Sequence, residues 1–303
     1  MGSFKFAASE YCFPVWGSLA VEMAGKAGFD GIEITDGGGY LQGHPDNNGF
    51  VEYERLGLDL RRQDSFPMND PYVQDYYMNA SEKYGVKLMG MFLYMLENQG
   101  FIKNSADSVQ GRDCMNTLER AIKAAVDMGI PRITVPASGL FGVFQHEYAF
   151  QKIAYAVKEA EEKGVRILVV SDDSVVWQKE IIDRTESKAK LAFRTLDPIV
   201  SASGNPADMI KMLGKNYIDQ IRVKDMKADS SGFVTKETGK NSLIGMGDGN
   251  FKEVAKAIKE SGYLGWIISE TPYYSSDFTE IGGDYKNAMV KDLETLKSVF
   301  NRE

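Results

Sequence analysis

The chain is poor in the residue types that most often form disulfides or hold transition metals. Its 303 residues include only two cysteines, Cys12 and Cys114, and two histidines, His44 and His146. The cysteines are far apart and lack the spacing of a zinc motif, so we expect no disulfide framework and a reducing compartment. No apolar run is long enough to span a bilayer, and the N-terminus lacks the pattern of a secretory leader. These absences predict a soluble cytoplasmic protein with no membrane partner.

The chain also lacks a concentrated run of positive charge. Its formal net charge is −8, and no basic stretch is present that could neutralise phosphates. We therefore expect no nucleic-acid partner. The composition, 43% hydrophobic and 26% charged, is that of an ordinary globular protein. An α/β barrel uses about this length as one domain, and no linker divides the chain, so a single domain over residues 1–303 is predicted.

What the chain does contain is a repeated unit. An amphipathic segment closes on a glycine and is followed at once by a short β-rich run, as at AGFDGIEIT from Ala27 and KGVRILVVS from Lys163. Glycine suits the left-handed residue after a helix, and a continuous Val/Ile/Leu run suits a strand buried on both faces. The strands expected in this way are Phe4–Glu10, Gly31–Thr35, Val86–Tyr94, Arg132–Ala137, Val165–Ser171, Leu191–Leu196, Ile218–Lys224 and Gly265–Glu270.

Eight strands alternating with helices predict an α/β fold, a closed (β/α)₈ TIM barrel. A doubly wound open sheet is the alternative, but no GxGxxG loop follows the first strand. Two long glycine-rich segments interrupt the repeat, Asp36–Asp70 and Ala228–Asn250. Both follow strands, on the face where barrel enzymes build their active sites, so we predict that these loops border the site. Surface loops without function are the alternative.

Charged side chains follow the predicted strands at the end where a barrel binds its substrate. A buried carboxylate is costly unless it is paired, hydrogen-bonded or bound to a metal. We predict structural roles for Glu33 and Asp225, and functional roles for Asp197 and Glu270, each of which closes an apolar run. The full set is Glu10, Glu33, Asp172, Asp173, Asp197, Arg222, Lys224, Asp225 and Glu270.

His146 lies between the fourth predicted strand and its helix, on the same face. A histidine titrates near neutral pH, which makes His146 a candidate general base; capping of the helix is the equal alternative. Aromatic residues also follow the strands, and they favour a ligand with sugar-like or flavonoid-like rings. They are Tyr11, Phe13, Trp16, Tyr94, Phe141, Phe144, Trp177, Tyr273 and Tyr274.

Three segments resemble the xylose isomerase-like TIM barrels, the sugar phosphate isomerase/epimerase superfamily. AGFDGIEIT resembles the second-strand signature of this family, IRVKD from Ile221 resembles its seventh-strand motif, and GMGDGNFKEVAKAIKESGYLGWIISE from Gly245 resembles its closing segment. The resemblance implies one divalent cation held by Glu, Asp, His and Glu from strands five to eight. These four positions fall on Ser171, Asp197, Arg222 and Glu270.

Two of the four positions depart from the family pattern. A serine is a weak neutral ligand, and an arginine cannot lose its proton to bind a metal. We predict that Arg222 takes the place of the cation and pairs with Asp197 and Glu270, so no cofactor is expected. The alternative is a bound Mn²⁺ or Mg²⁺, if Asp172 or Asp173 supplies a ligand.

Within this superfamily, the chain resembles the α subunit of bacterial C-glycoside deglycosidases. The resemblance rests on the SEYCFP start from Ser9, the glycine-rich loop and the aromatic site face. It implies a large barrel subunit that pairs with a small β-rich subunit and cleaves the carbon–carbon bond of a 3-oxo-glycoside. The alternatives are a ketose epimerase or inosose isomerase/dehydratase, and a catalytically silent binding subunit. The predicted catalytic residues are His146, Arg222, Lys224 and Glu270, and the predicted substrate-binding residues are Glu10, Phe13, Trp16, Tyr94 and Asp197.

Overall fold

The computed structural model describes residues 3–36, 66–139, 143–235, 238–275, 277–278 and 284–301. Eight parallel strands close into a barrel in the order β1-β10-β7-β6-β5-β4-β3-β2. The predicted α/β TIM barrel is therefore confirmed, and each expected strand is present to within two residues at either end. The barrel strands are β1 (Lys5–Ser9), β2 (Gly31–Thr35), β3 (Lys87–Phe92), β4 (Arg132–Pro136), β5 (Arg166–Val170), β6 (Lys190–Arg194), β7 (Ile218–Val223) and β10 (Trp266–Ser269).

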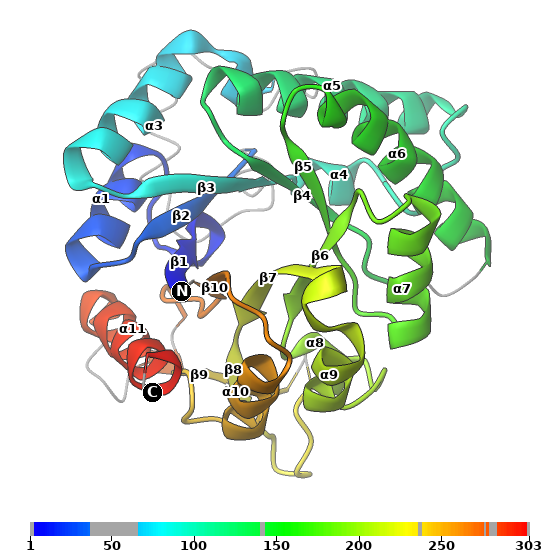
Figure 1. The fold of residues 1–303 in the computed structure, drawn as a ribbon. Coiled ribbons are helices and arrows are strands. Elements are labelled where there is room, and N and C mark those ends of the chain that lie inside the picture. Colours follow the sequence, from blue (N-terminus) through cyan, green and yellow to red (C-terminus); the bar gives the residue numbers. More distant parts are fainter. Residues whose placement is uncertain are drawn as a thin grey trace.

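Helices surround the barrel on its outside (Figure 1). The longer helices bury an apolar stripe against the strands and leave a charged side to solvent, as the three- and four-residue spacing predicts. Gly28 and Gly85 follow α1 and α3 in the left-handed conformation, with φ of 90° and 67°, which is why each repeat closes on a glycine. The helices are α1 (Ser18–Ala27), α3 (Pro71–Tyr84), α4 (Met95–Asn98), α5 (Val109–Asp127), α6 (Val143–Glu161), α7 (Val175–Arg184), α8 (Asp197–Val200), α9 (Pro206–Tyr217), α10 (Phe251–Glu260) and α11 (Tyr285–Phe300).

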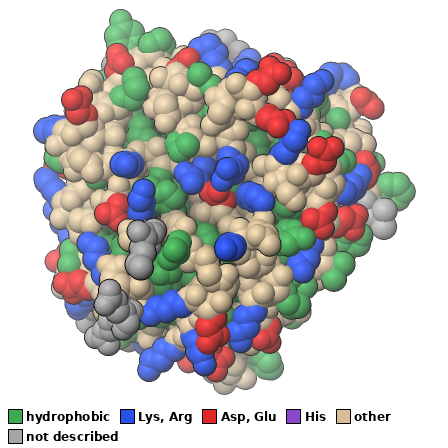
Figure 2. Space-filling model, in the orientation of Figure 1, with side chains coloured by type: hydrophobic (Ala, Val, Ile, Leu, Met, Phe, Trp, Pro, Cys, Tyr) green, Lys and Arg blue, Asp and Glu red, His purple; other side chains and the backbone are tan. Residues whose placement is uncertain are grey.

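The rim at the start of the strands is basic. Arg132 Nε lies 2.5 Å from Asp219 Oδ1, and Arg166 ion-pairs with the other oxygen of the same carboxylate. On the face where the N-terminus lies, Lys and Arg side chains gather near the middle around an acidic one (Figure 2). Folding thus concentrates positive charge that is dispersed along the sequence. Basic residues begin five barrel strands: Lys5, Lys87, Arg132, Arg166 and Lys190.

The segment after β7 is not the plain polar loop that its composition predicts. It forms a two-stranded antiparallel sheet from β8 (Asp225–Lys227) and β9 (Lys240–Ser242). The Asp225 carboxylate fixes the glycine-rich end of the segment, because it accepts hydrogen bonds from the backbone amides of Gly245, Gly247 and Gly249 at 2.9–3.0 Å. This is the structural role predicted for Asp225.

The other predicted loop, Asp36–Asp70, lies mostly outside the described residues. Of its described part, the Asp36 carboxylate accepts a hydrogen bond from the Met95 amide at 2.8 Å. Cys12 and Cys114 are both buried free thiols. In the described ranges, no helix is long and apolar enough to cross a membrane.

Candidate active site

A cavity of about 420 Å³ opens at the ends of the strands, on the face predicted to hold the site. Residues from the segments after β1, β3, β4, β5, β6, β7 and β10 contribute to its wall, as does β9. Charged and aromatic side chains line it together. They include Tyr11, Tyr94, Asp172, Arg194, Asp197, Lys224 and Glu270.

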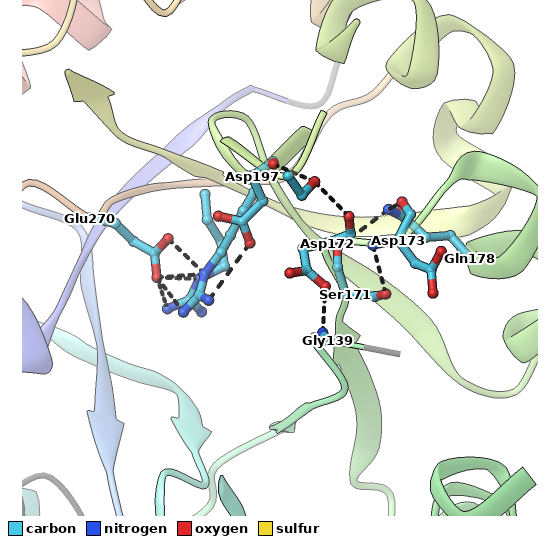
Figure 3. A network of polar contacts seen from close by, with 10 residues as sticks. Gly139, Ser171, Asp172, Asp173, Gln178, Asp197 and Glu270 are labelled. Carbon is cyan, nitrogen blue, oxygen red and sulfur yellow. Dashed lines mark hydrogen bonds and ion pairs between the residues drawn. The ribbon is translucent and has the colours of Figure 1, made fainter. Parts of the chain in front are cut away.

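Arg194 is the arginine that faces this cavity. It is the last residue of β6, and its side chain is 21% exposed. Its Nε lies 3.0 Å from Glu270 Oε2, and one terminal nitrogen lies 3.8 Å from Asp197 Oδ2. In Figure 3, dashed lines join both Glu270 and Asp197 to the nitrogen atoms between them. A fixed positive charge therefore lies between the two carboxylates that were predicted to be functional.

Arg222 lies beneath the cavity and not in its wall. Its side chain has no exposed surface. Its Nε donates to Glu270 Oε1 at 2.8 Å, and a terminal nitrogen forms a buried ion pair with Glu33. The predicted pairing with Glu270 is thus present, but the predicted pairing with Asp197 is wrong. Arg194 takes that partner because β6 ends directly beside Asp197.

Glu33 anchors the inner end of these contacts. Its carboxylate also accepts hydrogen bonds from Thr134 Oγ1 at 2.9 Å and Gln220 Nε2 at 3.0 Å, so its charge is fully paired inside the barrel. This is the structural role predicted for Glu33. Together Glu33, Arg222, Glu270, Arg194 and Asp197 form an ion-pair row, with signs that alternate from the barrel interior to the cavity.

The row sets the protonation states of its two outer carboxylates. Burial would raise the pKa of Glu270, but the charges of Arg194 and Arg222 outweigh it and lower the pKa to about 2. Burial raises the pKa of Asp197 to about 6 despite the nearby Arg194, because its ion pair is longer. Glu270 is therefore a permanent anion that holds two arginines, whereas Asp197 can exchange a proton near neutral pH.

His146 does not line the cavity. It is 6% exposed on α6, its Nε2 lies 2.9 Å from Asp173 Oδ2, and its ring stacks on Trp177 at 3.9 Å between centroids. Ser171 is also turned away: its hydroxyl accepts a hydrogen bond from the Asp173 amide at 3.2 Å. Asp172 does reach the cavity, where it accepts from the Gly139 amide at 2.7 Å (Figure 3). His146, the predicted base, is thus separated from Lys224, another predicted catalytic residue, which lies in the cavity wall.

Three predicted substrate-binding residues are buried away from the cavity. Phe13 and Trp16 have no exposed surface and are not part of the cavity lining: Phe13 packs in the main hydrophobic core, and Trp16 contacts Tyr11 edge-on. The Glu10 carboxylate accepts hydrogen bonds from the Thr35 and Gly17 amides and from the Tyr77 hydroxyl, at 2.6–2.8 Å. Burial raises the pKa of Glu10 to about 7, against these hydrogen bonds. We therefore correct the prediction for all three residues to a structural role.

Tyr94, Asp197 and Lys224 do lie in the cavity wall, and their roles stay predictions. Tyr94 stacks on Tyr11 with ring centroids 4.3 Å apart, which gives one wall an aromatic surface. Arg194 is the residue that reasoning from the sequence missed. The available signal was that Arg194 follows the apolar run LAF, just as Arg222 follows an apolar residue in β7.

Comparison with known proteins agrees with this architecture. The profile of the xylose isomerase-like TIM barrel family matches residues 21–299. The chain belongs to the xylose isomerase-like TIM barrel family. A search of curated protein sequences finds no match to it.

Solved structures show the same fold for this xylose isomerase-like TIM barrel. D-allulose 3-epimerase from Methylomonas sp. has a TM-score of 0.68 at 14% identity, over 99% of both chains. D-psicose 3-epimerase in the presence of D-fructose has a TM-score of 0.70 at 11% identity, over 98% of this chain and 100% of the other. The IOLI protein with a zinc atom has a TM-score of 0.69 at 15% identity, over 98% of both chains. At these identities, the likeness shows the fold alone.

The residues at the expected metal positions do not fit a divalent cation. Two of the four, Asp197 and Glu270, are carboxylates, and guanidinium groups already bind them. Of the other two, Ser171 has a hydroxyl that accepts a hydrogen bond from the Asp173 amide, and Arg222 adds a second positive charge. No group of three or more His, Cys, Asp or Glu side chains with metal-binding geometry occurs in the part of the chain that the structure describes. We derive no chemical step from a metal.

Proposed function

We propose that this chain is an enzyme that acts on a sugar or glycoside by removing a proton from the carbon next to a keto group. The observation that carries the proposal is the position of the Arg194 guanidinium in the cavity wall, 3.8 Å from the Asp197 carboxylate. A cation can stabilise the oxygen of an enolate, and a neighbouring carboxylate can take the proton. Removing one such donor from an active site costs about 10²- to 10³-fold in rate.

Asp197 is the base in this proposal. With a pKa of about 6 it is mostly ionised at neutral pH, yet basic enough to accept a proton. Glu270 serves a different purpose, because its pKa of about 2 makes it a poor base. It holds the Arg194 guanidinium in place through Nε and a terminal nitrogen, at 3.0–3.3 Å. A preorganised charge of this kind does not have to reorient during the reaction.

Two further groups support a sugar-like ligand. Lys224 follows β7 in the cavity wall and has no hydrogen-bond partner among the described residues, so its ammonium can bind a substrate oxygen. The stacked rings of Tyr11 and Tyr94 add an apolar surface to the wall of the same cavity. Pairs of aromatic rings beside a few convergent polar groups are typical of ligand sites.

The specific reaction that we propose is cleavage of a 3-oxo-C-glycoside. Asp197 takes the proton from the carbon between the keto group and the anomeric carbon, and Arg194 stabilises the enolate. The electrons then return to form a carbon–carbon double bond, and the bond to the aglycone breaks with its electron pair. The aglycone carbon takes up a proton. One base is enough for this elimination, and the SEYCFP start supports it; a small β-rich partner subunit and a cytoplasmic location stay part of the proposal.

Epimerisation of a ketose, or the related isomerisation or dehydration of an inosose, is the second candidate. Epimerisation exchanges a proton on both faces of one carbon, so it needs two acid–base groups. Glu97 and Asp172 also line the cavity and could supply the second. The shared fold with D-allulose and D-psicose 3-epimerases supports this candidate as well.

The test is incubation of the purified chain with a 3-oxo-C-glucoside, with and without a candidate small subunit, and in parallel with D-fructose and D-allulose. Aglycone release that is lost in Asp197→Asn and Arg194→Met supports the lyase. Conversion between the two ketoses supports the epimerase. Activity in neither assay contradicts both candidates and leaves a catalytically silent binding subunit.

A further inference from the structure

Asn241 is a cavity residue that comes from the segment between β7 and α10. It occupies the middle of β9, opposite Met226 of β8, and both residues line the cavity. The small β8–β9 sheet thus brings one amide side chain to the wall of the cavity that Glu270 and Lys224 also line. The reaction proposed above assigns no role to this amide.

The orientation of the Asn241 amide is fixed by its neighbours. Its Nδ2 donates to Asp277 Oδ2 at 2.9 Å and to Ser275 Oγ at 3.3 Å, and its backbone amide donates to the same Asp277 oxygen at 2.9 Å. Burial acts to raise the pKa of Asp277, but these hydrogen bonds lower it below its usual value. An ionised carboxylate can only accept, so the NH₂ group must face Asp277.

The Asn241 carbonyl oxygen is then left without a partner. Oδ1 is buried and accepts no hydrogen bond in the described part of the chain. The Ser138 hydroxyl, from another residue that lines this cavity, is also buried and unpaired among the described residues. Buried polar atoms are nearly always hydrogen-bonded, and a ligand in the cavity can supply the hydrogen bonds that these two atoms lack.

We propose that Asn241 is a specificity-determining residue whose Oδ1 accepts a hydrogen bond from a hydroxyl group of the substrate. This inference rests on the proposed function. Arg194 and Lys224 offer positive charge to the keto or enolate oxygen, whereas Asn241 offers only lone pairs. An uncharged hydroxyl-bearing end therefore fits at Asn241. A phosphate or carboxylate there would place its own lone pairs against Oδ1, so the site selects neutral polyhydroxylated substrates at that end.

The test compares kcat/KM for the substrate found above with that for each of its monodeoxy analogues. In the wild-type protein, kcat/KM for one analogue is lower by about 5- to 150-fold, since leaving a buried acceptor unpaired costs about 1–3 kcal/mol. In Asn241→Leu, the parent substrate falls by about the same factor and that analogue is no longer disfavoured. Asn116→Leu is the matched control, because Asn116 is exposed on α5, and it behaves as the wild type.

A second variant tests the same point without removing the amide. In Asp277→Asn the group that orients Asn241 loses its charge, and we expect partial loss of the discrimination between the parent and that analogue. If Asn241→Leu does not fold, this variant decides the question. Discrimination that is unchanged in both variants overturns the inference while the proposed function stands. Equal use of the substrate and its phosphorylated derivative also overturns it. If the wild type turns over no sugar, the proposed function itself fails.

Discussion

Arg194 and Arg222 are register partners on β6 and β7, and both guanidinium groups bind the carboxylate of Glu270. Like charges opposite each other on neighbouring strands repel, so the shared carboxylate is what makes this arrangement stable. The two arginines differ in what else they can reach. Arg222 has no exposed surface, whereas Arg194 borders the cavity. Substitutions should therefore separate a catalytic arginine from a structural one.

Replacing Arg194 should strongly reduce turnover without unfolding the protein. For Arg194→Met we expect kcat to fall by about 10²- to 10³-fold, because the charge that stabilises the enolate is lost. The measurement is steady-state kinetics, with circular dichroism to verify the fold. Arg166→Met, on the exposed basic rim at the other end of the barrel, is the matched control and should keep full activity. Equal losses in both variants would contradict a catalytic role for Arg194.

Replacing Arg222 should act mainly on stability. Arg222→Met leaves the buried Glu33 carboxylate without its ion pair, and breaking such a pair costs about 3–5 kcal/mol of unfolding free energy. The double variant Arg222→Met/Glu33→Gln removes both charges and should recover a large part of that loss. Urea unfolding of the two single variants and the double variant gives the coupling energy. Additive effects would show that the pair is not coupled.

The pH dependence of kcat/KM should reflect the ionisation of Asp197. A base works only when it is deprotonated, so kcat/KM should rise with pH through about 6, the pKa of Asp197, and then level off. His146→Gln should keep this inflection, since His146 lies outside the cavity and pairs with Asp173. The residual activity of Asp197→Asn should lack it. An inflection that disappears with His146 instead would restore the histidine as the base.

Chelation should leave the activity unchanged. Purified protein should contain no stoichiometric Mn, Mg or Zn by elemental analysis, because guanidinium groups bind both candidate carboxylate ligands. Arg222→His combined with Ser171→Glu should not create a metal site as long as Arg194 lies between Asp197 and Glu270. Tight stoichiometric metal in the wild-type protein, or activity that EDTA abolishes, would contradict this prediction.

The barrel could be predicted from the sequence because its signals are local. A buried parallel strand is a short run of Val, Ile and Leu, and a helix end is a glycine, so Gly31–Thr35 is predicted with its observed bounds. The β8–β9 sheet could not be predicted in the same way. Its strands have three residues each, and the hydrogen bonds from three glycine amides to Asp225 give no pattern in the sequence.

The active site was predicted less completely because pairing in space decides it. The sequence shows that Asp197 and Glu270 follow apolar runs, and the structure places both at the cavity. The sequence does not show which arginine reaches these carboxylates. We predicted Arg222 because it occupies the expected position of a metal ligand, but Arg194 makes the contact with Asp197. Glu10 follows a strand as Glu270 does, yet it turns inward to the Thr35 and Gly17 amides.

The ion-pair row also restricts which substitutions this protein can accept over time. The two most buried inner members, Arg222 and Glu270, each contact two neighbours of opposite sign, so a single replacement at either position leaves an uncompensated charge in a poorly hydrated interior. Positions in the row can therefore change only in concert. Exchanging the arginines for metal ligands would require an intermediate sequence of low stability. The alternating charges of the ion-pair row thus oppose a change from an arginine-based site to a metal site on this barrel.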